Sequence, residues 1–165
     1  MKIKTLLLTI IVLLAVGTSF CFAEGNDKEK AARELLITYD DMRYATEAGI
    51  TKVDYIRQYR ELYTATQKAK ETIDVDIYEK FDTTLKAYED ALIIWDSYGQ
   101  VFKIKDINKR TNYPYPYISQ SKHSDIFGQY QKEDVISYIF SEANIKEKDI
   151  KWFIDDKYKN SKEGE

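Results

Sequence analysis

The sequence predicts an all-α domain: an antiparallel three-helix bundle with an extended Tyr/Pro strap and two shorter C-terminal helices. Three observations support this prediction. Apolar residues recur every three or four positions along three long segments, which is the spacing of one helix face. Capping residues and a glycine separate these segments. The stretch Tyr113-Pro114-Tyr115-Pro116-Tyr117 interrupts the pattern, and it cannot be helical because each proline restricts both itself and the residue before it.

The first predicted helix begins at a capping signal over 26–29, where an Asn is followed three places later by a Glu. It ends at Gly49, because glycine takes the left-handed backbone conformation that closes a helix. Its apolar stripe consists of Ala32, Leu35, Leu36, Tyr39, Met42 and Ala45.

A second helix is expected from about Lys52 to Lys70, with Thr51 and Asp54 as its capping box. The short connection at Gly49 makes the first two helices an antiparallel hairpin. A break follows with Asp74 as the cap, although one bent continuous helix is the alternative. The third helix is predicted from Asp76 to about Phe102, with an apolar stripe of Ile77, Phe81, Leu85, Tyr88, Leu92 and Trp95.

The helical pattern disappears between Lys103 and Gln131, which is the predicted strap. Two shorter helices then close the chain, from about Lys132 to Ala143 and from about Lys146 to Tyr158, with a turn at Asn144-Ile145. We therefore expect a single domain over 24–160 and a frayed tail over 161–165.

The N-terminus has the pattern of a secretory signal peptide. Lys2 and Lys4 precede an uncharged apolar run from Leu6 to Val16, and Cys21-Phe22-Ala23 places small residues where a signal peptidase requires them. We expect cleavage after Ala23, so that residues 1–23 are removed and the rest is periplasmic or secreted.

Two alternatives remain for this N-terminus. Cys21 would carry a lipid if the protein were a lipoprotein, but Thr18 and Phe20 stand where bacterial lipoproteins have Leu and a small residue. An uncleaved anchor would need about 20 apolar residues, whereas Leu6 to Ala23 is shorter and is interrupted by Gly17, Thr18 and Ser19.

Cleavage would remove the only cysteine of the chain, so neither a disulfide nor cysteine-based zinc chemistry is expected in the exported domain. Its net charge, −3 for the whole chain, would become more negative by two through the loss of Lys2 and Lys4. An acidic exported domain is not suited to nucleic acid. We also expect no stable membrane insertion after cleavage.

No catalytic or metal-binding set is evident. His123 is the only histidine, and it lies in the irregular strap without a partner at a meaningful spacing. Asp96, between Trp95 and Ser97, is the one acid whose neighbours favour an unusual environment. Calcium-loop patterns begin at Asp74 and at Asp106, but both lack the required glycine and glutamate. We therefore expect neither a cofactor nor a metal, and a protein that is not an enzyme.

Tyrosine is abundant, with 14 residues in 165. Those on the apolar stripes, Tyr39, Tyr59, Tyr63 and Tyr88, are expected to pack inward with the hydroxyl at the edge of the core. Tyr113, Tyr115 and Tyr117 are different, because an extended strand turns its side chains in several directions. They are either a packing strap or a partner-binding edge for sugars or peptides.

The leading functional hypothesis is an exported, non-enzymatic helical domain of the bacterial cell envelope that binds a protein or cell-wall partner through Tyr113, Tyr115 and Tyr117. One alternative is a small cell-wall hydrolase in which the fold brings Asp96 and His123 together. Another is a periplasmic chaperone or stress protein with an exposed apolar face.

Overall fold

A computed structural model describes residues 26–115, 118 and 128–163, with side chains up to residue 159. The predicted signal peptide lies outside the described residues. The described part is mostly helical, with five helices and one small two-stranded sheet, which confirms the all-α class. In chain order the elements are an N-terminal helix over 26–47, α2 (Lys52–Ala69), α3 (Val75–Asp96), β1 (Val101–Lys103), α4 (Ile104–Ile107), β2 (Gln129–Gln131) and α5 (Lys132–Glu163).

The first two connections lie where the sequence places them. Gly49 has φ +87, in the left-handed region, and the hydroxyl of Thr51 accepts a hydrogen bond from the amide of Asp54 at 3.2 Å. α2 ends at Ala69 and α3 begins after Asp74, so they are separate helices and not one bent helix. The Asp74 side chain does not cap α3. It instead accepts a hydrogen bond from the Tyr158 hydroxyl of α5 at 3.1 Å.

The predicted end of the third helix is wrong by more than one turn, because α3 stops at Asp96 and Phe102 lies in β1. Ser97 already has extended backbone angles, and Gly99 follows with φ +99, so the chain turns away from the helix axis. The Lys132 ammonium, at the start of α5, donates to the Ser97 carbonyl at 2.7 Å, which satisfies an acceptor at the end of α3.

The predicted pair of short C-terminal helices is also wrong, because α5 is one helix of 32 residues. Its described backbone continues to Glu163, into the segment expected to be a frayed tail. Asn144, the predicted turn residue, lies buried within it. Its side-chain oxygen accepts hydrogen bonds from the Tyr88 hydroxyl at 2.8 Å and the Thr46 hydroxyl at 3.3 Å. These tertiary partners occupy the group that would otherwise compete for the helix backbone.

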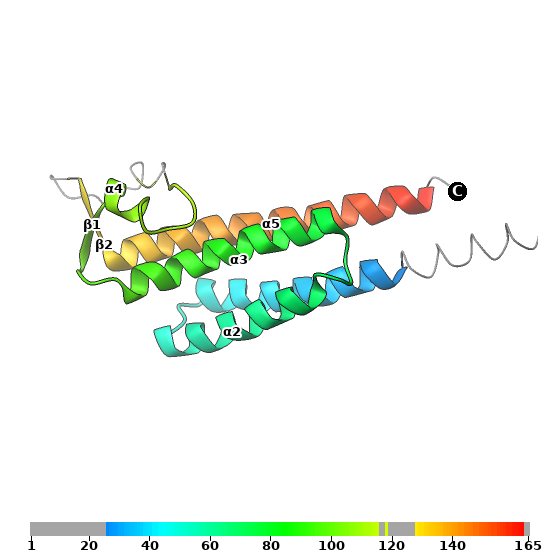
Figure 1. The fold of residues 1–165 in the computed structure, drawn as a ribbon, viewed down its shortest axis with the longest axis horizontal. Helices are drawn as coiled ribbons and strands as arrows, with labels where there is room; N and C mark the ends of the chain where they lie inside the picture. The colour runs from blue at the N-terminus through cyan, green and yellow to red at the C-terminus, as the bar shows by residue number, and fades with distance from the viewer. Residues whose placement is uncertain (1–25, 116–117, 119–127, 164–165) are drawn as a thin grey trace, which may run out of the picture.

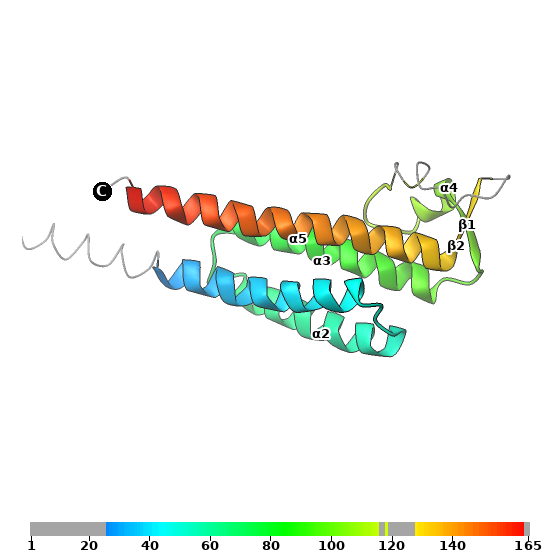
Figure 2. The same cartoon turned by 180° about the vertical axis from the view of Figure 1, so that it is seen from behind.

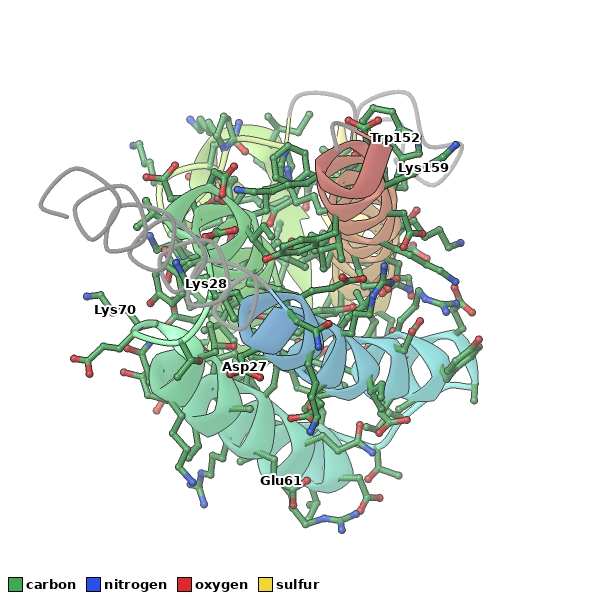
Figure 3. All side chains as sticks on the ribbon, turned by 90° about the vertical axis from the view of Figure 1, so that its right-hand side faces the viewer. Asp27, Lys28, Glu61, Lys70, Trp152 and Lys159 are labelled. Atoms are coloured by element: carbon green, nitrogen blue, oxygen red, sulfur yellow. The ribbon has the colours of Figure 1, made fainter. Side chains whose placement is uncertain are left out.

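The long helices lie side by side (Figures 1 and 2), with α5 along α3 and α2 on the other side of the N-terminal helix. Two ion pairs join the N-terminal helix to α5: Arg33 to Asp155 at 2.8 Å and Arg43 to Glu147 at 2.7 Å. Since the residue numbers rise in one helix as they fall in the other, these two helices are antiparallel. In the end-on view of Figure 3, Glu61 of α2 and Trp152 of α5 lie on opposite sides of the bundle.

The core consists of the apolar stripes together with fully buried tyrosines. Tyr39, Tyr55 and Tyr88 are 0% exposed, and each hydroxyl finds a partner inside the bundle. The Tyr39 hydroxyl, for example, donates to the Phe81 carbonyl at 2.8 Å. Tyr63, expected to point inward, is 49% exposed instead.

An extended strap was predicted between α3 and α5, but the described part of this segment is not extended throughout. β1 and β2 pair antiparallel, with Phe102 opposite Tyr130, and α4 follows β1 directly. The residues after α4 then cross α3, as described below. In the part of the chain that the structure describes, no helix combines the length and apolar character needed to cross a bilayer.

Candidate functional site

Of the three tyrosines that the sequence nominates for partner binding, the structure describes two, and these two lie in different environments. Tyr113 is half-buried, and the Lys146 ammonium of α5 lies 5.5 Å from its ring centroid. Tyr115 is 3% exposed, and its ring meets that of Tyr138 edge-on at 6.1 Å. Tyr117 lies outside the described residues. Tyr115 is therefore a packing residue here, and only Tyr113 of the described pair keeps an accessible ring.

Asp90 of α3 holds this part of the chain in place. Its carboxylate accepts hydrogen bonds from the amide of Asn112 at 2.5 Å, the amide of Tyr113 at 3.2 Å and the hydroxyl of Tyr115 at 2.8 Å. Next to it, the Glu89 carboxylate accepts a hydrogen bond from the Asn112 side chain at 3.0 Å. Two adjacent acids of α3 thus fasten the segment after α4 to the bundle.

The Asp90 side chain is completely buried and makes no ion pair with any described residue. Burial raises the pKa of this carboxyl, because water no longer stabilises its charge, while the three hydrogen bonds act in the opposite direction. Asp90 is not among the candidate residues that the sequence indicates. Its spacing of three and four positions from Ala87 and Ile94, two further apolar residues that α3 buries, was the available signal.

We take as the candidate site a shallow, open groove beside α2 and the C-terminal end of α3, with a volume of about 530 Å³. We call it the tyrosine groove, and its lining residues are Tyr59, Glu89, Leu92, Ile93, Asp96, Ser97, Tyr98 and Arg110. Volumes of about 300–1,000 Å³ are typical of small-molecule sites. The groove is therefore large enough for a ligand of a few rings.

Tyr98 is the most exposed large apolar residue of the described chain, at 98%. It lies between the end of α3 and Gly99, whose positive φ sets the direction of the turn. Tyr59 of α2 is half-buried in the groove, and its ring centroid is 6.5 Å from that of Tyr63, which is half exposed on the same helix. Tyrosines from two elements therefore border this groove.

Some charged groups of the groove already form ion pairs or hydrogen bonds, and one does not. Asp96 forms an ion pair with Lys52 of α2 at 2.5 Å, and Glu89 accepts the hydrogen bond from Asn112. Arg110, an exposed residue of the lining, forms neither an ion pair nor a side-chain hydrogen bond with any described residue. Its guanidinium is the one charged group of the groove with its full set of donors available.

Of the predicted Asp96–His123 pair, the structure describes Asp96 alone. The Asp96 side chain is 67% exposed and engaged with Lys52, which is the ordinary environment of a surface carboxylate. His123, its proposed partner, lies outside the described residues. Among the described residues no three His, Cys, Asp or Glu side chains come close enough together to hold a metal ion.

Comparison with known proteins found no matching family model, no matching curated protein and no matching solved structure.

Proposed function

We propose that this protein is an exported, non-enzymatic helical domain of the bacterial cell envelope that binds a partner in the tyrosine groove. Export is expected from the signal-peptide pattern over 1–23. The observation that carries the binding proposal is the presence of an almost fully exposed tyrosine, Tyr98, and an unengaged guanidinium, Arg110, in the lining of one groove.

These two residue types support binding for physical reasons. Tyrosine offers a large contact area and loses little conformational entropy when it binds, and arginine presents several donors in a fixed plane. Both types are enriched among residues that dominate binding energies. Neither side chain forms a hydrogen bond or an ion pair with any described residue.

The finer architecture belongs to the same proposal. An antiparallel three-helix bundle, made of the N-terminal helix, α2 and α3, is the unit that carries the groove, and α5 packs against it. The Tyr/Pro strap over 113–117 is a second contact element of this proposal, through Tyr113 and Tyr117, while Tyr115 anchors the segment to Asp90.

Photo-crosslinking in intact cells tests the proposal. A photoreactive phenylalanine derivative replaces Tyr98 in one strain and Tyr44 in another; Tyr44 is 60% exposed on the N-terminal helix, outside the groove. We expect a discrete adduct from position 98 that is absent from position 44. If position 98 gives no adduct, or if both positions give the same adducts, the groove is not the contact surface.

A further inference from the structure

We infer that the partner of the tyrosine groove is a neutral, N-acetylated glycan chain of the cell wall. This inference rests on the proposed function and specifies its ligand. Three features of the groove support it: the aromatic and aliphatic surface, the balance of charge, and the fixed backbone of the residues that would contact the ligand.

The apolar surface of the groove suits a sugar ring. Tyr98 and Tyr59 contribute aromatic rings to its lining, and Leu92 and Ile93, both partly exposed, contribute aliphatic surface. The face of an aromatic ring is negatively polarised, so it attracts the C–H groups that line one face of a pyranose. Tyr63 extends this surface along α2, at a ring separation of 6.5 Å from Tyr59. A linear chain of sugars would thus meet successive tyrosines.

The polar groups favour a ligand without net charge. The groove lining contains two acids, Glu89 and Asp96, and one base, Arg110. Lys52 lies outside the lining but forms the ion pair with Asp96, so the four charges together sum to zero. A polyanion would meet the two carboxylates, and a polycation would meet the guanidinium and the ammonium. A glycan avoids both conflicts, because its hydroxyl groups donate to carboxylates while its acetamide carbonyl accepts from Arg110.

The composition of the groove favours a glycan over a folded protein. Specific protein partners bury roughly 800 Å² on each side, with an apolar centre. The described groove instead mixes charged and aromatic groups within a volume of about 530 Å³. That composition is typical of a site for a chain of small polar rings.

The residues that would contact the glycan are held by the fold. The Ser97 hydroxyl donates to the Ile93 carbonyl at 2.6 Å, which fixes the backbone just before Tyr98. The backbone amide of Arg110 donates to the Ile107 carbonyl at 2.8 Å, and Asn112 is fastened to α3 through Glu89 and Asp90. Because the backbone at Tyr98 and Arg110 is fixed before binding, the ordering entropy lost on binding would be that of their exposed side chains.

Titration of the purified exported protein with the hexamer of β-1,4-linked N-acetylglucosamine, followed by calorimetry and amide NMR, tests the inference. We expect saturable binding with shifts centred on α2 and the end of α3. Tyr98→Ser and Arg110→Gln should each weaken it about tenfold or more, since each removes a principal contact. Two matched substitutions on exposed residues outside the groove, Tyr44→Ser and Arg57→Gln, should leave it unchanged.

The outcomes separate this inference from the proposed function. Undetectable binding of the hexamer, or equal losses in the groove variants and their matched controls, would overturn the glycan assignment. If position 98 still crosslinks to a protein in cells, groove binding stands and the ligand class is wrong. If neither the hexamer nor a crosslinked partner is found, both proposals fall.

Discussion

The buried carboxylate of Asp90 gives the sharpest test of the structure, through the variant Asp90→Ala. The substitution leaves three donors without an acceptor: the amides of Asn112 and Tyr113 and the hydroxyl of Tyr115. Hydrogen bonds to charged groups contribute about 1.5–3 kcal/mol each. Removal of the desolvated charge offsets part of this loss, so we expect the free energy of unfolding to fall by about 3–5 kcal/mol.

Urea denaturation at pH 7, followed by far-UV circular dichroism, measures this change. Tyr115→Phe is the matched control, because it removes one of the three hydrogen bonds and keeps the ring against Tyr138. We expect this variant to lose about 1–2 kcal/mol. A loss below about 1 kcal/mol for Asp90→Ala would refute the argument, because three charge-assisted bonds cannot then be present.

The same carboxyl predicts the direction of a pH effect. Burial raises the pKa of Asp90 in the folded state, so the folded protein holds this proton more tightly than the unfolded chain does. As pH falls through the interval between the unfolded and folded pKa values, protonation of Asp90 adds stability. The stability advantage of the wild type over Asp90→Asn should therefore widen on acidification. A narrowing difference would mean that the hydrogen bonds outweigh burial.

Three further predictions follow from other buried contacts. Arg43→Ala leaves Glu147, which is 1% exposed, without its ion-pair partner. It should lower the free energy of unfolding by about 3 kcal/mol in urea denaturation. An unchanged urea midpoint would show that this ion pair does not contribute to stability. Asn144→Ala removes the acceptor of the buried Tyr88 hydroxyl and should lower thermal stability by about 1–3 kcal/mol, measured by calorimetry. Gly99→Ala places a side chain at φ +99 and should destabilise by about 1–2 kcal/mol in the same assay; no loss would indicate that the turn relaxes freely.

The helices that the sequence predicts well are those with local signals at both ends. Gly49 and Thr51 end one helix and start the next within three residues, and Asp74 marks the following start. These signals depend only on backbone conformation and neighbouring side chains. They can therefore be recognised without knowledge of the tertiary structure.

The predictions that failed depend on contacts between residues far apart in the chain. Asn144 has the local character of a turn residue, yet it lies inside α5 because Tyr88 and Thr46, from two other helices, hydrogen-bond to it. Phe102 fits the helical period of α3, yet it lies in β1 opposite Tyr130. No local pattern in the sequence indicates these long-range partners. The sequence therefore predicted α3 too long and predicted α5 as two helices.

The tyrosine excess shows why residue type alone does not locate a binding site. Most of the tyrosines that the structure buries direct their hydroxyls to acceptors in the bundle: Tyr39 to a carbonyl of α3, Tyr55 to another, and Tyr115 to Asp90. Such residues combine core packing with a hydrogen bond that leaves no buried polar group unsatisfied. Their number therefore reflects stability and gives no information about ligands.

Tyr98 differs from this group in both respects. Its ring is 98% exposed, and its hydroxyl has no hydrogen-bond partner among the described residues. Truncating it should consequently leave the free energy of unfolding nearly unchanged, in contrast with Tyr115→Phe, while it weakens partner binding. A substitution that weakens binding and leaves the free energy of unfolding unchanged identifies a recognition residue. Substitution of a buried tyrosine cannot give this result, because it lowers the free energy of unfolding as well.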